Sequence, residues 1–158
     1  MKFILPIITL LLFTITSTGQ NVNLTEMIKL NNLGIEEFDT SVTRKGFTYK
    51  ETQKNDSAES TVYKNGKGRN TSYITKAIYK TDNWEMVSYQ TNDESTYLKF
   101  KTELKNLGFN YVGKNVSDDD TIMFYYKKDN LKLTLSSWLN KAEEKYTVYE
   151  ISIIKDKD

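Results

Sequence analysis

The sequence predicts an α+β fold of two similar halves, each a helix followed by a four-stranded antiparallel meander. The eight strands are expected to join into one sheet with the helices on one face. Twice along the chain the hydrophobic period changes from about 3.6 to about 2, which indicates a helix followed by strands. A shift of 62 residues also aligns the two halves. The 158 residues, 38% hydrophobic with one proline, are typical of a folded globular chain.

The two halves share the pattern F-x3-[VL]-x3-G-F-x-Y, which fits residues 38–49 and again residues 100–111. The same shift aligns Val62-Tyr63 with Phe124-Tyr125, and residues 84–87 with residues 146–149. Because a fixed period is the sequence mark of repeat architecture, we interpret the halves as two copies of one unit. The predicted division is 1–19 for a signal peptide, 20–91 for a leader helix and the first copy, and 92–158 for the second.

The N-terminus has the features of a Sec-type signal peptide. Lys2 precedes an apolar stretch over residues 3–15, and the small residues Ser17 and Gly19 suit cleavage after Gly19. The stretch is shorter than the roughly 20 apolar residues that span a bilayer, and no later segment is apolar enough, so no transmembrane segment is expected in the mature chain. We therefore expect a periplasmic or secreted protein.

Removal of the signal peptide balances the charge of the chain. The 22 lysines and arginines become 21 without Lys2, which equals the 21 aspartates and glutamates. Nucleic-acid-binding proteins commonly carry an excess of basic residues on one face. A nucleic-acid partner is therefore not expected.

Three helices are expected from apolar stripes and end signals. A leader helix spans residues 24–32, where Asn23 and Glu26 have the spacing of a capping box. Gly34 separates it from the helix of the first half. The apolar stripes and the glycines that end the two longer helices are, in the first half, Ile35, Phe38, Val42 and Gly46, and in the second Tyr97, Phe100, Leu104, Leu107 and Gly108. Asp93 or Ser95 is expected to cap the second of these helices.

Strands follow each of these two helices, because the segments alternate and are rich in Tyr, Thr, Val, Ile and Phe. The linkers between them carry Asn, Asp, Gly and Ser, which favour turns. The expected strands are 47–53, 60–65, 71–80 and 84–91 in the first half, and 109–116, 121–128, 131–139 and 145–155 in the second.

The composition excludes several classes of chemistry, because the chain has no histidine and no cysteine. Ser-His-Asp and Cys-His catalysis, disulfides and zinc sites with thiolate or imidazole ligands all need one of these residues. We expect no cofactor and no enzymatic activity. A hydrolase that uses two carboxylates remains an alternative, because aspartate and glutamate are plentiful.

The strongest candidate for a binding surface is the sheet face opposite the helices. Leu131, Leu133 and Leu135 are expected to point toward the helices, which directs Trp138 to the other face. By the repeat register, four further residues share that face with Trp138: Trp84, Met86, Tyr146 and Val148. An exposed patch of aromatic residues and methionine is typical of a binding surface.

Two loops resemble ion sites only weakly. Asp118, Asp119 and Asp120 could contribute to a calcium site, since Ca²⁺ prefers oxygen ligands, but no EF-hand spacing accompanies them. We therefore interpret them as a solvated hairpin turn, in which aspartate is an ordinary residue. The Gly66-Lys67-Gly68-Arg69 segment lacks the strand–loop–helix context of a phosphate-binding loop. We interpret it as a flexible hairpin.

A tandem of this kind resembles the β-lactamase inhibitory protein family in topology over residues 35–154, although the cysteines of that family are missing here. The resemblance implies a concave sheet that grips a protein partner. The helix-ending Lys45-Gly46-Phe47 also resembles uncharacterised, signal-bearing envelope and secreted proteins of Gram-negative bacteria, and this second resemblance implies no function.

The sequence therefore predicts an exported, non-enzymatic module that binds a protein or another ligand, such as an envelope component, through the open aromatic face. One alternative is an envelope assembly domain that pairs through its sheet edges, with the strand ending near Ile154 as the candidate edge. The carboxylate-based hydrolase is a further alternative.

Overall fold

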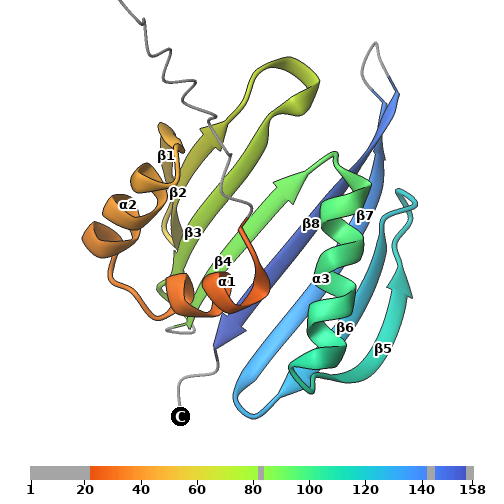
Figure 1. Cartoon of the computed structure of the whole chain (residues 1–158). Helices are drawn as coiled ribbons and strands as arrows, with labels where there is room; N and C mark the ends of the chain where they lie inside the picture. The colour runs from red at the N-terminus through yellow and green to blue at the C-terminus, as the bar shows by residue number, and fades with distance from the viewer. Residues whose placement is uncertain (1–21, 82–83, 142–144, 156–158) are drawn as a thin grey trace, which may run out of the picture.

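The computed structural model describes residues 22–81, 84–141 and 145–155, which form one eight-stranded antiparallel sheet and three α-helices. The strand order is β1-β2-β3-β4-β8-β7-β6-β5, and all three helices lie against one face of the sheet (Figure 1). The predicted fold class is confirmed. The predicted signal peptide, residues 1–19, lies outside the described residues.

The elements agree closely with the ranges expected from the sequence. The helices are α1 (Leu24–Asn31), α2 (Ile35–Arg44) and α3 (Glu94–Asn106), with a short 3-10 turn, η1 (Gly68–Asn70), between β2 and β3. The strands are β1 (Thr48–Lys54), β2 (Ala58–Asn65), β3 (Ser72–Tyr79), β4 (Trp84–Thr91), β5 (Asn110–Val116), β6 (Ile122–Lys128), β7 (Leu131–Asn140) and β8 (Tyr146–Lys155).

The helix ends follow the expected capping chemistry, with one exception. Asn23 and Glu26 form a capping box on α1, and the Asp93 carboxylate accepts hydrogen bonds from the amides of Ser95 and Thr96 at the start of α3. Helix α2 instead starts after Gly34, which offers no side-chain acceptor. The two longer helices therefore differ at their N-termini.

The core lies between the helices and the facing side of the sheet. Leu133 and Leu135 of β7 point into it as predicted, and they share it with side chains from all three helices. Lys76 of β3 is the one charged residue among the fully buried side chains, 1% exposed, and its ammonium lies 2.7 Å from the carboxylate of Glu85 on β4.

The strand order and pairing are symmetric about the middle of the sheet. The halves join where β4 pairs with β8, and Tyr89 pairs there with Ile151, 62 positions later in the sequence. The neighbouring pairs, Ser88–Ser152 and Gln90–Glu150, exchange places under the same shift. Both outer strands also have a β-bulge at the same place, between Tyr49 and Glu51 in β1 and between Tyr111 and Gly113 in β5.

The constant shift does not extend to the second strand of each half. Tyr49 of β1 pairs with Tyr63, whereas Tyr111 of β5 pairs with Tyr126 and not with Tyr125, which the ungapped alignment would require. The connection between β6 and β7 spans only residues 129–130, whereas the β2–β3 connection spans residues 66–71. The outer strand pairs of the halves therefore have different registers.

The predicted edge strand is wrong. The strand that ends near Ile154, β8, lies in the middle of the sheet between β4 and β7, because the halves join through their last strands. The edges of the sheet are β1 and β5.

Within the described ranges, none of the helices is both long and apolar enough to cross a membrane.

Candidate binding site on the open sheet face

The strand register directs all five residues proposed for the binding surface away from the helices, but it divides them into two groups. Met86 pairs with Ile154 at one end of β8, whereas Trp138 pairs with Val148 at the other. Val148 and Ile154 are six positions apart along β8, which at about 3.3 Å per residue is roughly 20 Å. We call the two regions the Trp84 end, with Met86, and the Trp138 end, with Tyr146 and Val148.

At the Trp84 end the aromatic side chains contact each other. The indole of Trp84 stacks on the ring of Tyr79, its cross-strand neighbour, with 3.7 Å between ring centroids and 17° between planes. This pair closes the β3–β4 hairpin. One side of the Trp84 indole is thus already covered by Tyr79.

At the Trp138 end the side chains enclose a cavity of about 110 Å³. It lies between the β2–β3 loop, the start of β3, the end of β4, the end of β7 and the start of β8. Three aromatic rings and several neutral polar side chains contribute to its lining, which consists of Gly68, Arg69, Thr71, Tyr73, Gln90, Thr91, Asn92, Trp138, Asn140, Tyr146 and Val148. This is where three of the five predicted residues meet.

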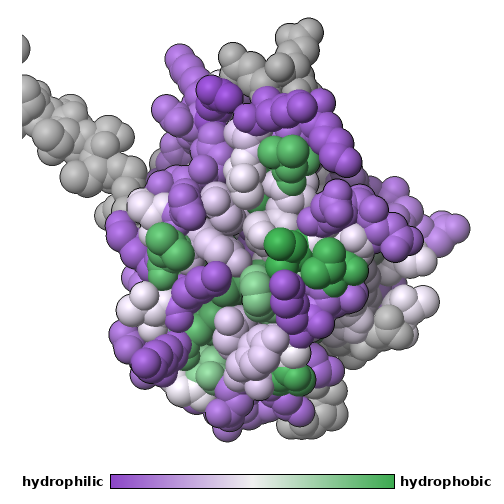
Figure 2. All heavy atoms as spheres, turned by 90° about the vertical axis from the view of Figure 1, so that its right-hand side faces the viewer, coloured by the Kyte–Doolittle hydropathy of each residue, from purple (hydrophilic) through white to green (hydrophobic). Residues whose placement is uncertain are grey.

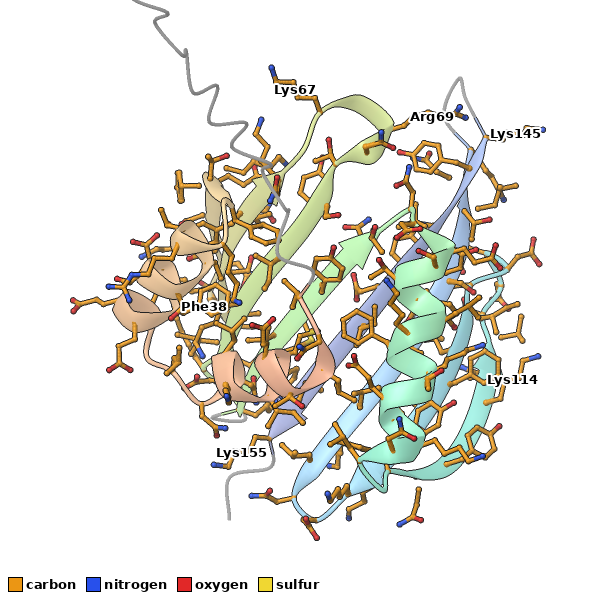
Figure 3. The ribbon with its side chains drawn as sticks, viewed as in Figure 1. Phe38, Lys67, Arg69, Lys114, Lys145 and Lys155 are labelled. Atoms are coloured by element: carbon orange, nitrogen blue, oxygen red, sulfur yellow. The ribbon has the colours of Figure 1, made fainter. Side chains whose placement is uncertain are left out.

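The β2–β3 loop forms one wall of the cavity because its glycines let it fold back on itself. Gly66 has φ of 96°, and a Cβ atom there would lie 2.1 Å from the carbonyl oxygen of Asn70. The hydroxyl of Thr71 donates to the carbonyl of Gly68 at 2.8 Å. The loop thereby places the guanidinium of Arg69 5.8 Å from the ring centroid of Tyr146, across the width of β4. Figure 3 shows Lys67, Arg69 and Lys145 at this end of the molecule.

Trp138 differs from the other large rings of this end because it has no hydrogen-bond or ring partner among the described residues. The hydroxyl of Tyr146 accepts a hydrogen bond from the Asn140 amide at 2.8 Å, and the ammonium of Lys50 lies 5.4 Å from the ring centroid of Tyr73. Within the part of the chain that the structure describes, the half-buried Trp138 indole makes neither a hydrogen bond nor a ring contact. Its ring and its N–H group are available to a ligand.

Glu150 lies one step further along the open face, between Gln90 of β4 and Ser136 of β7. The side chain is half-buried and accepts a hydrogen bond from the Ser152 hydroxyl at 2.9 Å. Burial raises the pKa of Glu150, and the bond from Ser152 partly opposes this shift. Of the residues that the structure describes, those that line the cavity include no carboxylate.

The three aspartates proposed as a weak calcium site form the β5–β6 turn. One oxygen of Asp119 accepts from the Thr121 amide at 3.2 Å and from the hydroxyl of Ser117, and these bonds lower the pKa of Asp119. Asp120 adopts a left-handed backbone with φ of 64°. Over residues 22–81, 84–141 and 145–155, no group of three or more acidic side chains is arranged to hold a metal ion.

The sequence prediction missed the cavity residues contributed by the first half. Tyr73 could have been found by strand alternation, because it precedes the buried Ile74 and so belongs to the open face. Arg69 could not, because its position depends on how the β2–β3 loop folds over the neighbouring strand.

No family model, curated protein or solved structure matches this chain.

Proposed function

We propose that the protein is an exported, non-enzymatic binding module that holds its ligand at the Trp138 end of the open sheet face. The observation that carries this proposal is a half-buried, unpartnered Trp138 beside a cavity that both halves line. Export rests on the predicted signal peptide, and we expect mass spectrometry of the native protein to find a chain that begins at Gln20.

The composition of the cavity supports binding through aromatic burial. Tryptophan and tyrosine dominate the binding energy of many interfaces, because they bury a large rigid surface and keep one polar group for a hydrogen bond. Trp138, Tyr146 and Tyr73 bring three such rings to one site. We infer that the two halves are copies of one 62-residue unit. Among the described residues, only the Trp138 end of the open face brings these three rings together.

The arrangement of carboxylates favours binding over hydrolysis. Glycosidase mechanisms need two carboxylates about 5–10 Å apart on either side of the bond that is cleaved. Glu150 is near the cavity, but its cross-strand neighbours on this face are Gln90 and Ser136, which are neutral. Among the described residues, the site thus has groups that can bind and orient a ligand but no paired acid and base.

The test compares two substitutions at the two ends of the face. Immobilised wild-type protein, Trp138→Ala and Trp84→Ala are screened in parallel against peptide and glycan arrays. We expect Trp138→Ala to lose at least tenfold in affinity for any ligand that the wild-type protein selects, as a central aromatic anchor would. Trp84→Ala should keep that affinity. Equal binding by Trp138→Ala and wild type would contradict the proposed site.

A second candidate function is assembly through a sheet edge, and one observation favours it. The edge strand β5 exposes Tyr111 by 58%, Val112 by 65% and Val116 by 51%. Figure 2, which views the molecule from the side on which β5 lies in Figure 1, shows hydrophobic groups between hydrophilic side chains. Unpaired apolar edges are templates for strand addition, so β5 could pair with a strand of a second molecule.

A further inference from the structure

We infer that the ligand of the Trp138 end is a carbohydrate, one pyranose ring of which enters the cavity and is bound without being cleaved. The inference rests on the proposed function, because it names the ligand class of the same site. It is argued from the polar groups, the rings, the size and the charge of the cavity.

The polar lining suits a ligand that has many hydroxyl groups. Gln90, Asn92 and Asn140 present side-chain amides, and Thr71 and Tyr73 present hydroxyls. Each of these groups can both donate and accept hydrogen bonds. A sugar hydroxyl also does both, so neighbouring hydroxyls on a ring can be matched without leaving a buried donor or acceptor unpaired, which would be costly.

The aromatic lining suits the apolar side of the same ring. A pyranose presents axial C–H groups on its faces and hydroxyls around its rim, so it can stack on an aromatic face while its rim makes hydrogen bonds. The Trp138 ring is half-buried and has no ring partner within the described residues. The Trp84 ring, in contrast, is stacked on Tyr79. Only the Trp138 end therefore combines an available indole with amide groups.

The size of the cavity limits what enters it to about one ring. Its volume is about 110 Å³, below the roughly 300 Å³ at which pockets for drug-sized ligands begin. An enclosed cavity of about 150 Å³ holds benzene. A single sugar ring that keeps part of its rim in solvent fits these limits, and further rings of an oligosaccharide would lie along the open sheet face.

The charge of the lining permits neutral and acidic sugars. Among the described residues, Arg69 is the one cation in the lining, and no carboxylate contributes to it. The segment over residues 61–81, which forms the loop wall and the flanking strands, contains no aspartate or glutamate. The described part of the lining therefore presents no fixed negative charge to a carboxylate on the sugar.

The experiment uses the fact that the chain has only two tryptophans. In Trp84→Phe the emission comes from Trp138 alone, and in the matched control Trp138→Phe it comes from Trp84 alone. Each protein is titrated with cellotriose, chitotriose and trigalacturonate up to about 10 mM, since weak sugar sites can have dissociation constants near 1 mM. Circular dichroism checks that both variants are folded.

We expect a saturable change in Trp138 emission with at least one trisaccharide, and no change in Trp84 emission. Gln90→Ala in the Trp84→Phe background should weaken that binding about threefold to tenfold, as the loss of one hydrogen bond would. Chromatography of each trisaccharide after long incubation should find it uncleaved.

The outcomes separate this inference from the proposed function. If the arrays select a peptide whose binding needs Trp138, and no trisaccharide changes Trp138 emission, the site stands and the carbohydrate is wrong. If trisaccharides instead change the emission of Trp84 in the control protein, the location of the site is wrong. Cleaved trisaccharide would overturn the statement that the ring is bound without hydrolysis.

Discussion

The two ends of the open sheet face have similar aromatic content but different structures. At the Trp84 end, Trp84 stacks on its cross-strand neighbour Tyr79. At the Trp138 end, the β2–β3 loop brings Arg69 over Tyr146 and leaves Trp138 beside a cavity. Aromatic residues alone therefore do not form the candidate site. The site also needs the β2–β3 loop and a ring that has no ring partner among the described residues.

The approximate symmetry shows which positions differ. Trp84 and Tyr146 correspond, and so do Met86 and Val148, each pair 62 positions apart. Their cross-strand neighbours differ in size: Met86 pairs with the small Ala77, whereas Val148 pairs with the large Trp138. In the first half, therefore, Trp84 lies at the end of the β3–β4 hairpin, where it stacks on Tyr79. In the second half, Trp138 lies two residues before the end of β7 and lines the cavity.

The largest predicted effect concerns the buried ion pair, which only the first half contains. Glu85→Ala would leave the buried ammonium of Lys76 without its carboxylate. Breaking a buried pair costs about 3–5 kcal/mol, and we expect about 3 kcal/mol because the Glu85 side chain is 26% exposed. Urea unfolding followed by circular dichroism measures the loss.

Thr147→Ala is the matched control for Glu85→Ala, because Thr147 occupies the corresponding position in the second half. We expect it to change the free energy of unfolding by less than about 1 kcal/mol. If both substitutions cost the same, the two halves do not differ in the way described. Replacing the pair together, as Lys76→Met with Glu85→Leu, should recover much of the lost stability.

The second effect distinguishes the stacked Trp84 from Trp138, which lines the cavity. Trp84→Ala removes a stacked ring, and we expect a loss of about 2 kcal/mol from lost burial and lost stacking. Trp138→Ala removes a half-buried ring without a ring partner among the described residues, and we expect a loss of about 1 kcal/mol. The urea midpoints of the two variants measure the difference, and the opposite order would contradict it.

Most of the fold could be predicted from the sequence because its local patterns are consistent. The alternation Leu131, Leu133, Leu135 fixed which face of β7 meets the helices, and Gly46 and Gly108, with φ of 84° and 76°, ended α2 and α3 where expected. The strand ranges differ from the predicted ones by two residues or less. Periodicity and turn residues act locally, so a single sequence is enough to read them.

The strand order and the site depend on contacts that no local pattern reports. Alternation places Trp84 and Trp138 on one face, but only the pairing of β4 with β8 shows that they lie at opposite ends of it. The same pairing moves the strand near Ile154 from the edge to the middle. Arg69 reaches Tyr146 through a loop conformation that its glycines permit but do not specify alone.

The third effect compares the N-termini of the two longer helices. Asp93→Ala removes the cap of α3 and should cost about 1 kcal/mol, whereas Gly34→Asp should add a cap to α2 and gain a few tenths of a kcal/mol. Gly34 has φ of −63°, and a Cβ atom there meets nothing within 4 Å, so the substitution fits. Thermal unfolding of both variants measures the two changes.

The cost of Asp93→Ala should also depend on pH. The hydrogen bond from Thr96 and those from Ser95 lower the pKa of Asp93 in the folded state. The stability that the carboxylate contributes is therefore complete above its unfolded pKa, near 3.9, and is lost as the pH falls through the folded pKa. Wild type and Asp93→Ala should converge in stability toward pH 2. A difference that stays constant from pH 7 to pH 2 would contradict this account of the cap.

The smallest effect on stability concerns the two sheet edges, which differ at their bulges. The bulged residue is Lys50 in β1 and Val112 in β5, so a charge that discourages strand pairing at one edge is missing at the other. Val112→Lys should leave the free energy of unfolding within about 0.5 kcal/mol of the wild type, because the side chain is 65% exposed. If β5 pairs with a second copy, sedimentation at increasing concentration should show association that Val112→Lys removes and Lys50→Val at the other edge does not. A wild type that stays monomeric at every concentration excludes self-assembly through β5.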